Sequence, residues 1–182
     1  MRTSIAVPAV LALSLSLGCG QSESPTSPSI TPTFSASQKA GESTPAAAAP
    51  AVPLQGRFDG TFRVSGAPPV VDVVLDATGE ASHLGRFTQH FEHQASFIDN
   101  TGKGDAVFVA ANGDRLLTHA TGIATPQETP GVLFIVETHT IYGGTGRFAA
   151  ATGTFTVNRA AALTSPDTGT TEGTLQGSIS LR

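Results

Sequence analysis

The 182-residue sequence is poor in charged residues, in aromatic residues and in cysteine. Charged residues make up 13% of the chain, against roughly 25% in an average soluble domain. The net charge is −4, so the sequence lacks the basic character that a nucleic-acid partner would require. A single Cys excludes both an internal disulfide and a cysteine-rich metal site, and there is no Trp. We therefore expect no nucleic-acid partner.

Motifs that mark cofactor and metal enzymes are also missing. The sequence has no nucleophile elbow, no phosphate-binding loop, no dinucleotide fingerprint and no His-Glu-x-x-His pattern. The glycines at 143, 144 and 146 lack a Lys and lie between two expected strands, which is typical of a turn. His90 and His93 are an odd number of residues apart, so a strand would place them on opposite faces. We expect no cofactor and no metal site from local spacing.

The first 19 residues have the pattern of a secretion signal. Arg2 precedes an uncharged run over residues 5–17, which is shorter than the roughly 20 residues that span a membrane. The run ends in Ser16-Leu17-Gly18-Cys19, and Cys19 is the only Cys. This ending resembles the lipobox of bacterial lipoproteins, although that family usually has Leu at the position of Ser16. The resemblance implies a signal peptide over 1–18, an acylated Cys19, and membrane lipid as a partner. An ordinary signal peptide is the alternative.

Residues 19–53 are expected to form a linker. From residue 20 to residue 53, Ser, Thr, Pro and Ala account for 24 of 34 residues, so almost nothing is available to bury. In the lipoprotein family an Asp after the Cys favours retention at the inner membrane, and this chain has Gly20. The expected location is therefore the cell envelope, with a preference for the outer membrane and periplasm.

Residues 54–182 alternate with a period of two, which is typical of β-strands. Eight strands are expected, joined by short connections, and the pair Asn112-Gly113 predicts a tight hairpin. A short helical turn is expected near residues 148–151. Short connections favour antiparallel neighbours, and eight strands are enough to close a barrel, although a sandwich is the alternative. The expected strands are residues 57–64, 70–75, 86–97, 106–111, 116–123, 132–141, 154–163 and 174–181.

A family resemblance spans roughly residues 56–181. It is carried by residues 82–88, by Glu-Thr-His-Thr-Ile at 137–141, by Gly-Gly-Thr-Gly-Arg-Phe at 143–148 and by residues 151–155. These segments resemble bacterial relatives of the allene oxide cyclase and dirigent barrels. The resemblance implies an all-β, eight-stranded antiparallel barrel, commonly assembled as a trimer. No residue here matches the catalytic positions of those two families.

Two sets of residues are candidates for a site. The odd positions of the strand at 86–97 are mainly apolar and are expected to face inward; they include Phe87, Gln89, Phe91, His93 and Phe97. Apolar walls with a few polar groups are typical of a small-molecule pocket, and a barrel filled by these same side chains is the alternative.

Glu137 and His139 share one face of another expected strand, about 7 Å apart. They are either an acid–base pair or part of a structural ion pair. Which face of their strand lies inside is open, because both faces carry apolar residues.

Three functions fit these patterns. The first is a lipid-anchored envelope barrel that binds a small apolar ligand or serves as an interaction module. The second is a cyclase or isomerase that acts on a small apolar substrate in the barrel lumen. The third is a filled, purely structural barrel. Strands at 70–75, 106–111 and 132–136 are apolar on both faces, which favours a homo-oligomer in which a partner subunit covers the outer face.

Overall fold

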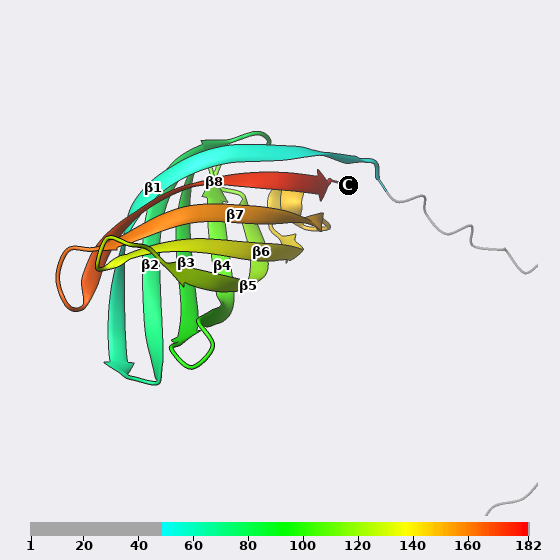
Figure 1. Ribbon diagram of the computed structural model, residues 1–182. Helices are drawn as coiled ribbons and strands as arrows, with labels where there is room; N and C mark the ends of the chain where they lie inside the picture. Colours follow the sequence, from blue (N-terminus) through cyan, green and yellow to red (C-terminus); the bar gives the residue numbers. More distant parts are fainter. Residues whose placement is uncertain (1–48, 182) are drawn as a thin grey trace, which may run out of the picture. The chain divides into compact units, whose positions relative to one another are not determined.

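A computed structural model describes residues 49–181, which form a closed barrel of eight antiparallel strands (Figure 1). Each strand pairs with its neighbours in the sequence, and β1 pairs with β8 to close the sheet. The all-β barrel predicted from the alternation is therefore confirmed. The strands are β1 (Ala51–Ala67), β2 (Val70–Ala81), β3 (Gly85–Ser96), β4 (Thr101–Ala110), β5 (Arg115–Pro126), β6 (Val132–Gly144), β7 (Thr152–Leu163) and β8 (Thr168–Ser180), with a 3-10 turn η1 (Gly146–Phe148) before β7.

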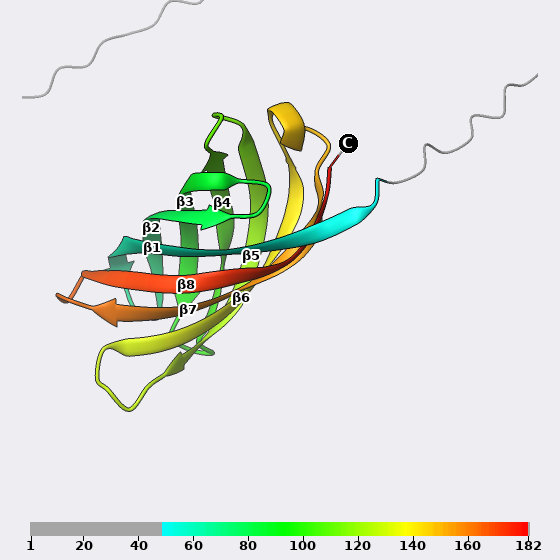
Figure 2. The same cartoon turned by 90° about the horizontal axis from the view of Figure 1, so that it is seen from above.

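The long strand β1 joins the two sides of the barrel. It pairs with β8 from Ala51 to Arg63 and with β2 from Gly56 to Ala67. Figure 1 shows it bending from one set of strands to the other, and Figure 2 shows it beside β8. Because each strand alternates between an inward and an outward side chain, the apolar residues of one parity fill the interior.

One end of the barrel is closed and the other is open. At the closed end, η1 places the ring of Phe148 in the interior of the barrel, where it is fully buried. Leu54, Leu84, Leu116 and Ile179 are buried there as well. The opposite end is bounded by the connections at residues 67–70, 96–101, 126–132 and 163–168, which we call the mouth loops.

Several expected boundaries need correction. β8 begins at Thr168, so most of the loop expected at 164–173 is strand. The sequence there is rich in Thr and Gly, and Gly169 leaves room for the ring of Phe62 on the neighbouring strand. β1 begins at Ala51, inside the segment expected as linker, and β5 continues to Pro126.

The expected signal peptide, Cys19 and the linker up to residue 48 lie outside the described residues. Within residues 49–181, no helix is long and apolar enough to cross a membrane.

Candidate functional site

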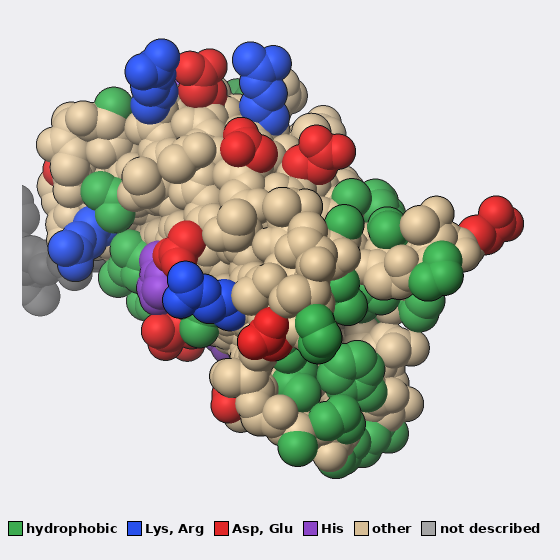
Figure 3. All heavy atoms as spheres, turned by 90° about the vertical axis from the view of Figure 1, so that its left-hand side faces the viewer, with side chains coloured by type: hydrophobic (Ala, Val, Ile, Leu, Met, Phe, Trp, Pro, Cys, Tyr) green, Lys and Arg blue, Asp and Glu red, His purple; other side chains and the backbone are tan. Residues whose placement is uncertain are grey.

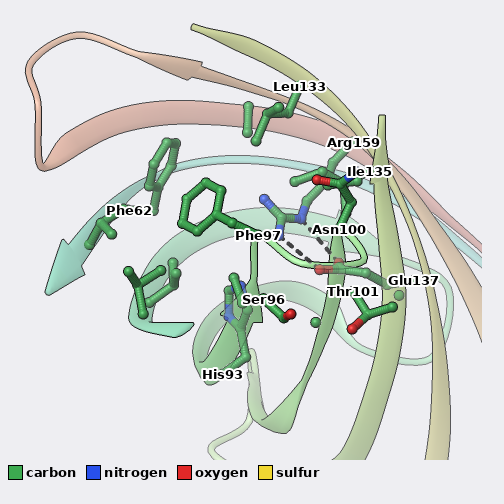
Figure 4. A pocket seen from close by; sticks show the side chains of 18 of the residues that line it. Phe62, His93, Ser96, Phe97, Asn100, Thr101, Leu133, Ile135, Glu137 and Arg159 are labelled. Atoms are coloured by element: carbon green, nitrogen blue, oxygen red, sulfur yellow. Dashed lines mark hydrogen bonds and ion pairs between the residues drawn. The ribbon is translucent and has the colours of Figure 1, made fainter. Parts of the chain in front are cut away.

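An apolar cavity of about 240 Å³ opens between the mouth loops (Figure 4). Its lining residues come from every strand except β8, together with the mouth loops. Hydrophobic side chains also gather on the outer surface at this end of the molecule (Figure 3). The apolar wall residues include Phe62, Val64, Val71, Val73, Leu133, Ile135 and Ala161.

A buried ion pair forms the polar part of the cavity lining. The Arg159 guanidinium donates two hydrogen bonds to the Glu137 carboxylate, at 3.0 Å from Nε to Oε2 and at 2.8 Å from Nη2 to Oε1. Only 5% of Glu137 and 4% of Arg159 is exposed. Burial alone would raise the pKa of the Glu137 carboxyl, but the facing Arg159 charge and its hydrogen bonds hold that pKa well below its usual range. The pair is therefore fully ionised at neutral pH and carries no net charge.

Glycines on the adjacent strands make room for this pair. A Cβ atom on Gly122 would lie 2.5 Å from Cγ of Glu137, and one on Gly173 would lie 2.7 Å from Cβ of Arg159. Real Cβ atoms do not approach other atoms so closely, so each ionic side chain occupies space that only glycine leaves open. The sequence thus provides the space for the pair as well as its charges.

His93 contributes a second polar group to the lining. Its ring stacks on Phe91 with 4.3 Å between centroids, and Nδ1 is buried without a hydrogen-bond partner among the described residues. Burial, and then the nearby Arg159 charge, lowers the pKa of His93 to about 4. The imidazole is therefore neutral at physiological pH, with one nitrogen able to donate and the other able to accept.

His139 lies two residues after Glu137 on β6, toward the closed end, and is not part of the cavity lining. It is fully buried, its Nδ1 lies 2.9 Å from the Thr118 hydroxyl, and its ring stacks on Phe155 at 4.8 Å. Its Nε2 lies 3.9 Å from Oε2 of Glu137 and has no hydrogen-bond partner. The odd residues of β6 therefore face inward, and the open question of which face is inside is answered.

The residues predicted on β3 divide between the cavity and the filled core. Phe87, Gln89 and Phe91 face inward as predicted, but they do not line the cavity. His93 does line it. Phe97 lines the mouth but is not on the buried face, because β3 ends at Ser96 and the turn that follows leaves 60% of Phe97 exposed. The lumen is thus filled over part of its length and open at one end.

Arg159 was not among the site residues predicted from the sequence. The signal was present, since Arg159 interrupts the inward series Phe155, Val157 and Ala161 on β7 with a charge. A charged side chain at an inward position of a barrel strand requires a buried counter-ion, and Glu137 was the available carboxylate.

His90 and His119 do not enlarge this site. His90 contacts Asp76 and Glu92, and His119 contacts Asp105, with all five side chains exposed on the outer wall. Among residues 49–181, no group of three or more His, Cys, Asp or Glu side chains is arranged to hold a metal ion.

Comparison with known proteins identifies the fold. No family model matches the sequence, and no curated protein matches it. Among solved structures, the barrel is similar to that of the pterocarpan synthase dirigent protein GePTS1, with a TM-score of 0.50 and 14% identity. The likeness covers 72% of this chain and 85% of that one. The chain therefore has an eight-stranded barrel of the dirigent type, as its sequence resemblance implied.

Proposed function

We propose that the barrel binds one small, mainly apolar molecule in the cavity between its mouth loops. The observation that carries the proposal is the cavity itself, an apolar space of about 240 Å³ with a few convergent polar groups at its inner side. Small-molecule sites have this composition, with apolar walls for affinity and few polar groups for orientation.

The polar groups favour an uncharged ligand. Glu137 and Arg159 neutralise each other, and His93 is neutral, so nothing compensates a charge brought into the cavity. Arg159 uses Nε and Nη2 on the carboxylate, and its Nη1 has no protein acceptor among the described residues. A hydroxyl or carbonyl group on the ligand can therefore interact with Arg159 Nη1 or with His93.

Binding of the neutral dye N-phenylnaphthylamine tests this proposal. The dye fluoresces in apolar surroundings, and we expect saturable binding that Ala161→Leu weakens at least tenfold by filling the cavity. The matched control is Ala162→Leu, because Ala162 is the next residue on β7 and is absent from the cavity lining. Equal dye affinity in both variants, with both folded, would exclude the cavity as the binding site.

The alternative function, a cyclase or isomerase, has less support from the geometry. Glu137 is held ionised by Arg159 and is a weak base, and His139 has no surface in the cavity. His93 is the one titratable side chain in the lining that could transfer a proton. Replacing His93 with Gln separates the two functions: a binding protein changes its affinity, whereas an enzyme keeps its ligand and loses turnover.

We also propose, from the sequence pattern alone, that the chain is anchored to lipid through Cys19 in the cell envelope. Fractionation of cells expressing Cys19→Ser tests this. The variant should leave the membrane fraction or accumulate as uncut precursor. A variant that is processed normally and stays in the membrane would contradict lipid attachment at Cys19.

A further inference from the structure

The exposed hydrophobic side chains are concentrated at one end of the barrel. Of the eight large hydrophobic residues that the described part of the chain exposes, only Tyr142 lies toward the closed end. Figure 3 shows hydrophobic side chains gathered around the opposite, open end. The other seven are Val70, Phe97, Ile98, Ile123, Phe134, Val136 and Leu163.

The most exposed of these residues project from the tip of a turn. Phe97 and Ile98, between β3 and β4, are 60% and 77% exposed. Phe97 and Leu163 also belong to the cavity lining, so the apolar surface continues from the loop tips into the cavity. Exposure of such a continuous apolar rim to water is unfavourable. This indicates that another surface covers the rim.

The charges of the mouth loops restrict what that surface is. The four loops contain no Lys or Arg and carry three acidic residues, Asp99, Glu128 and Asp167. Two copies meeting mouth to mouth would bring these carboxylates together, which is unfavourable. An anionic surface is disfavoured for the same reason. A surface that is apolar and has no net charge fits both the rim and its acids.

The chain outside the described residues allows the barrel to reach a membrane. From Cys19 to Ala51 the sequence advances 51 − 19 = 32 residues. As a flexible coil this length spans about 31 Å, and fully extended it spans about 105 Å. Ala51 lies at the closed end, so an acylated Cys19, which belongs to the function proposed above, would leave the mouth within reach of the lipid when this segment extends beyond its coil span.

We propose that the mouth end docks on a zwitterionic lipid layer, with Phe97 and Ile98 inserted among the lipids. Insertion of exposed apolar side chains at the boundary between headgroups and acyl chains is a general way for proteins to bind membranes. The cavity then opens toward the lipid. An apolar ligand passes between the layer and the cavity along Phe97 and Leu163 without crossing water.

The absence of Trp from the sequence provides a direct test. The full chain with Phe97→Trp, which then contains a single Trp, is reconstituted on vesicles of phosphatidylcholine. The lipid carries bromine on its acyl chains, and bromine quenches Trp fluorescence. We expect a blue-shifted emission and at least a twofold loss of intensity on brominated vesicles compared with unlabelled ones. The matched control is Tyr142→Trp, at a position 57% exposed near the closed end, which should show neither change.

A second substitution links the signal to the rim. Adding Ile98→Ser to Phe97→Trp should reduce the quenching by at least half, and so should replacing part of the phosphatidylcholine with phosphatidylglycerol. Equal quenching at positions 97 and 142, or none at 97, would overturn the docking. A blue shift at 97 without lipid that grows with protein concentration would also overturn it, because a second copy would then cover the rim.

Failure of docking can be told apart from failure of the proposed function. If the chain stays on the vesicles while Trp at 97 is unquenched, the anchor holds and the mouth points away from the lipid. Loss of dye binding in the Ala161→Leu variant, measured without vesicles, reports on the cavity alone.

Discussion

At the residue scale, the Glu137–Arg159 pair places two opposite charges in the interior of the barrel. Both side chains are nearly inaccessible to water, and each satisfies the charge of the other through two hydrogen bonds. A buried ion pair contributes little stability relative to apolar residues of the same size. Removing one partner, however, leaves an uncompensated charge in the interior.

We therefore expect Arg159→Met to lower the free energy of unfolding by about 3–5 kcal/mol. The double variant Glu137→Gln with Arg159→Met should recover part of that loss, because no uncompensated charge remains. Urea denaturation at pH 7 measures both values. The single variant Glu137→Gln completes the cycle, and a loss in the double variant equal to the sum of the two single losses would mean that the two side chains do not interact in solution.

His93 makes stability depend on pH. Its pKa is about 4 in the folded protein against 6.5 ordinarily, so the unfolded chain takes up a proton first as the pH falls. The free energy of unfolding should therefore decrease between pH 6.5 and pH 4, by up to about 3 kcal/mol in total.

The variant His93→Gln should lack this decrease, and denaturation between pH 7 and pH 5 measures it. That window excludes Glu137, whose lowered pKa removes stability only at more acidic pH. His90 has a raised pKa, from hydrogen bonds to Asp76 and Glu92, and acts in the opposite direction in both proteins. Identical pH profiles for the two proteins would contradict the burial of a neutral His93.

At the element scale, the pairing of β4, β5 and β6 depends on small residues at defined positions. Gly102 of β4 is the cross-strand partner of Gly122 of β5, and Gly122 in turn faces Glu137 of β6. A Cβ on Gly122 would collide with Glu137, whereas one on Gly102 would make only ordinary contacts of 3.5 Å or more.

We expect Gly122→Ala to lower the melting temperature, with a loss of stability of about 1–3 kcal/mol from overpacking. Gly102→Ala, its partner in register, should be nearly neutral. Thermal unfolding followed by circular dichroism compares the two. A neutral Gly122→Ala would show that both Glu137 and the β6 backbone at Val136 can shift at no cost.

Strand alternation predicted most of the elements, because inward and outward residues differ strongly in polarity on β1 and β3. It failed on the first part of β8, residues 168–173, where Thr and Gly replace large apolar residues and the pattern resembles a loop until the neighbouring Phe62 is known. The cavity was only partly predictable. His93 followed from its parity on β3, but the Glu137–Arg159 pair joins two strands, and sequence spacing does not reveal cross-strand partners.

At the scale of the whole molecule, the outer wall supports the prediction of an oligomer. Val74, Val107 and Val109 are only half-buried, and they lie on outward faces of β2 and β4 away from the mouth loops. We propose a homo-oligomer through this wall, and light scattering at tens of micromolar measures its mass. Val107→Lys should dissociate it. A monomeric mass for the unmodified protein would contradict the prediction.

The pairing of the first and last strands has a consequence for engineering the chain. Ala51 and Ser180 are direct cross-strand partners, so the two ends of the barrel sequence lie side by side. A short peptide can therefore join them, and new termini can be opened at the Asn112-Gly113 hairpin, where a Cβ on Gly113 would meet no atom within 4 Å. Such a circular permutant keeps every strand pair and the cavity. It also frees the native start of β1 from the N-terminal segment, so that the barrel can be attached to a surface from a different point.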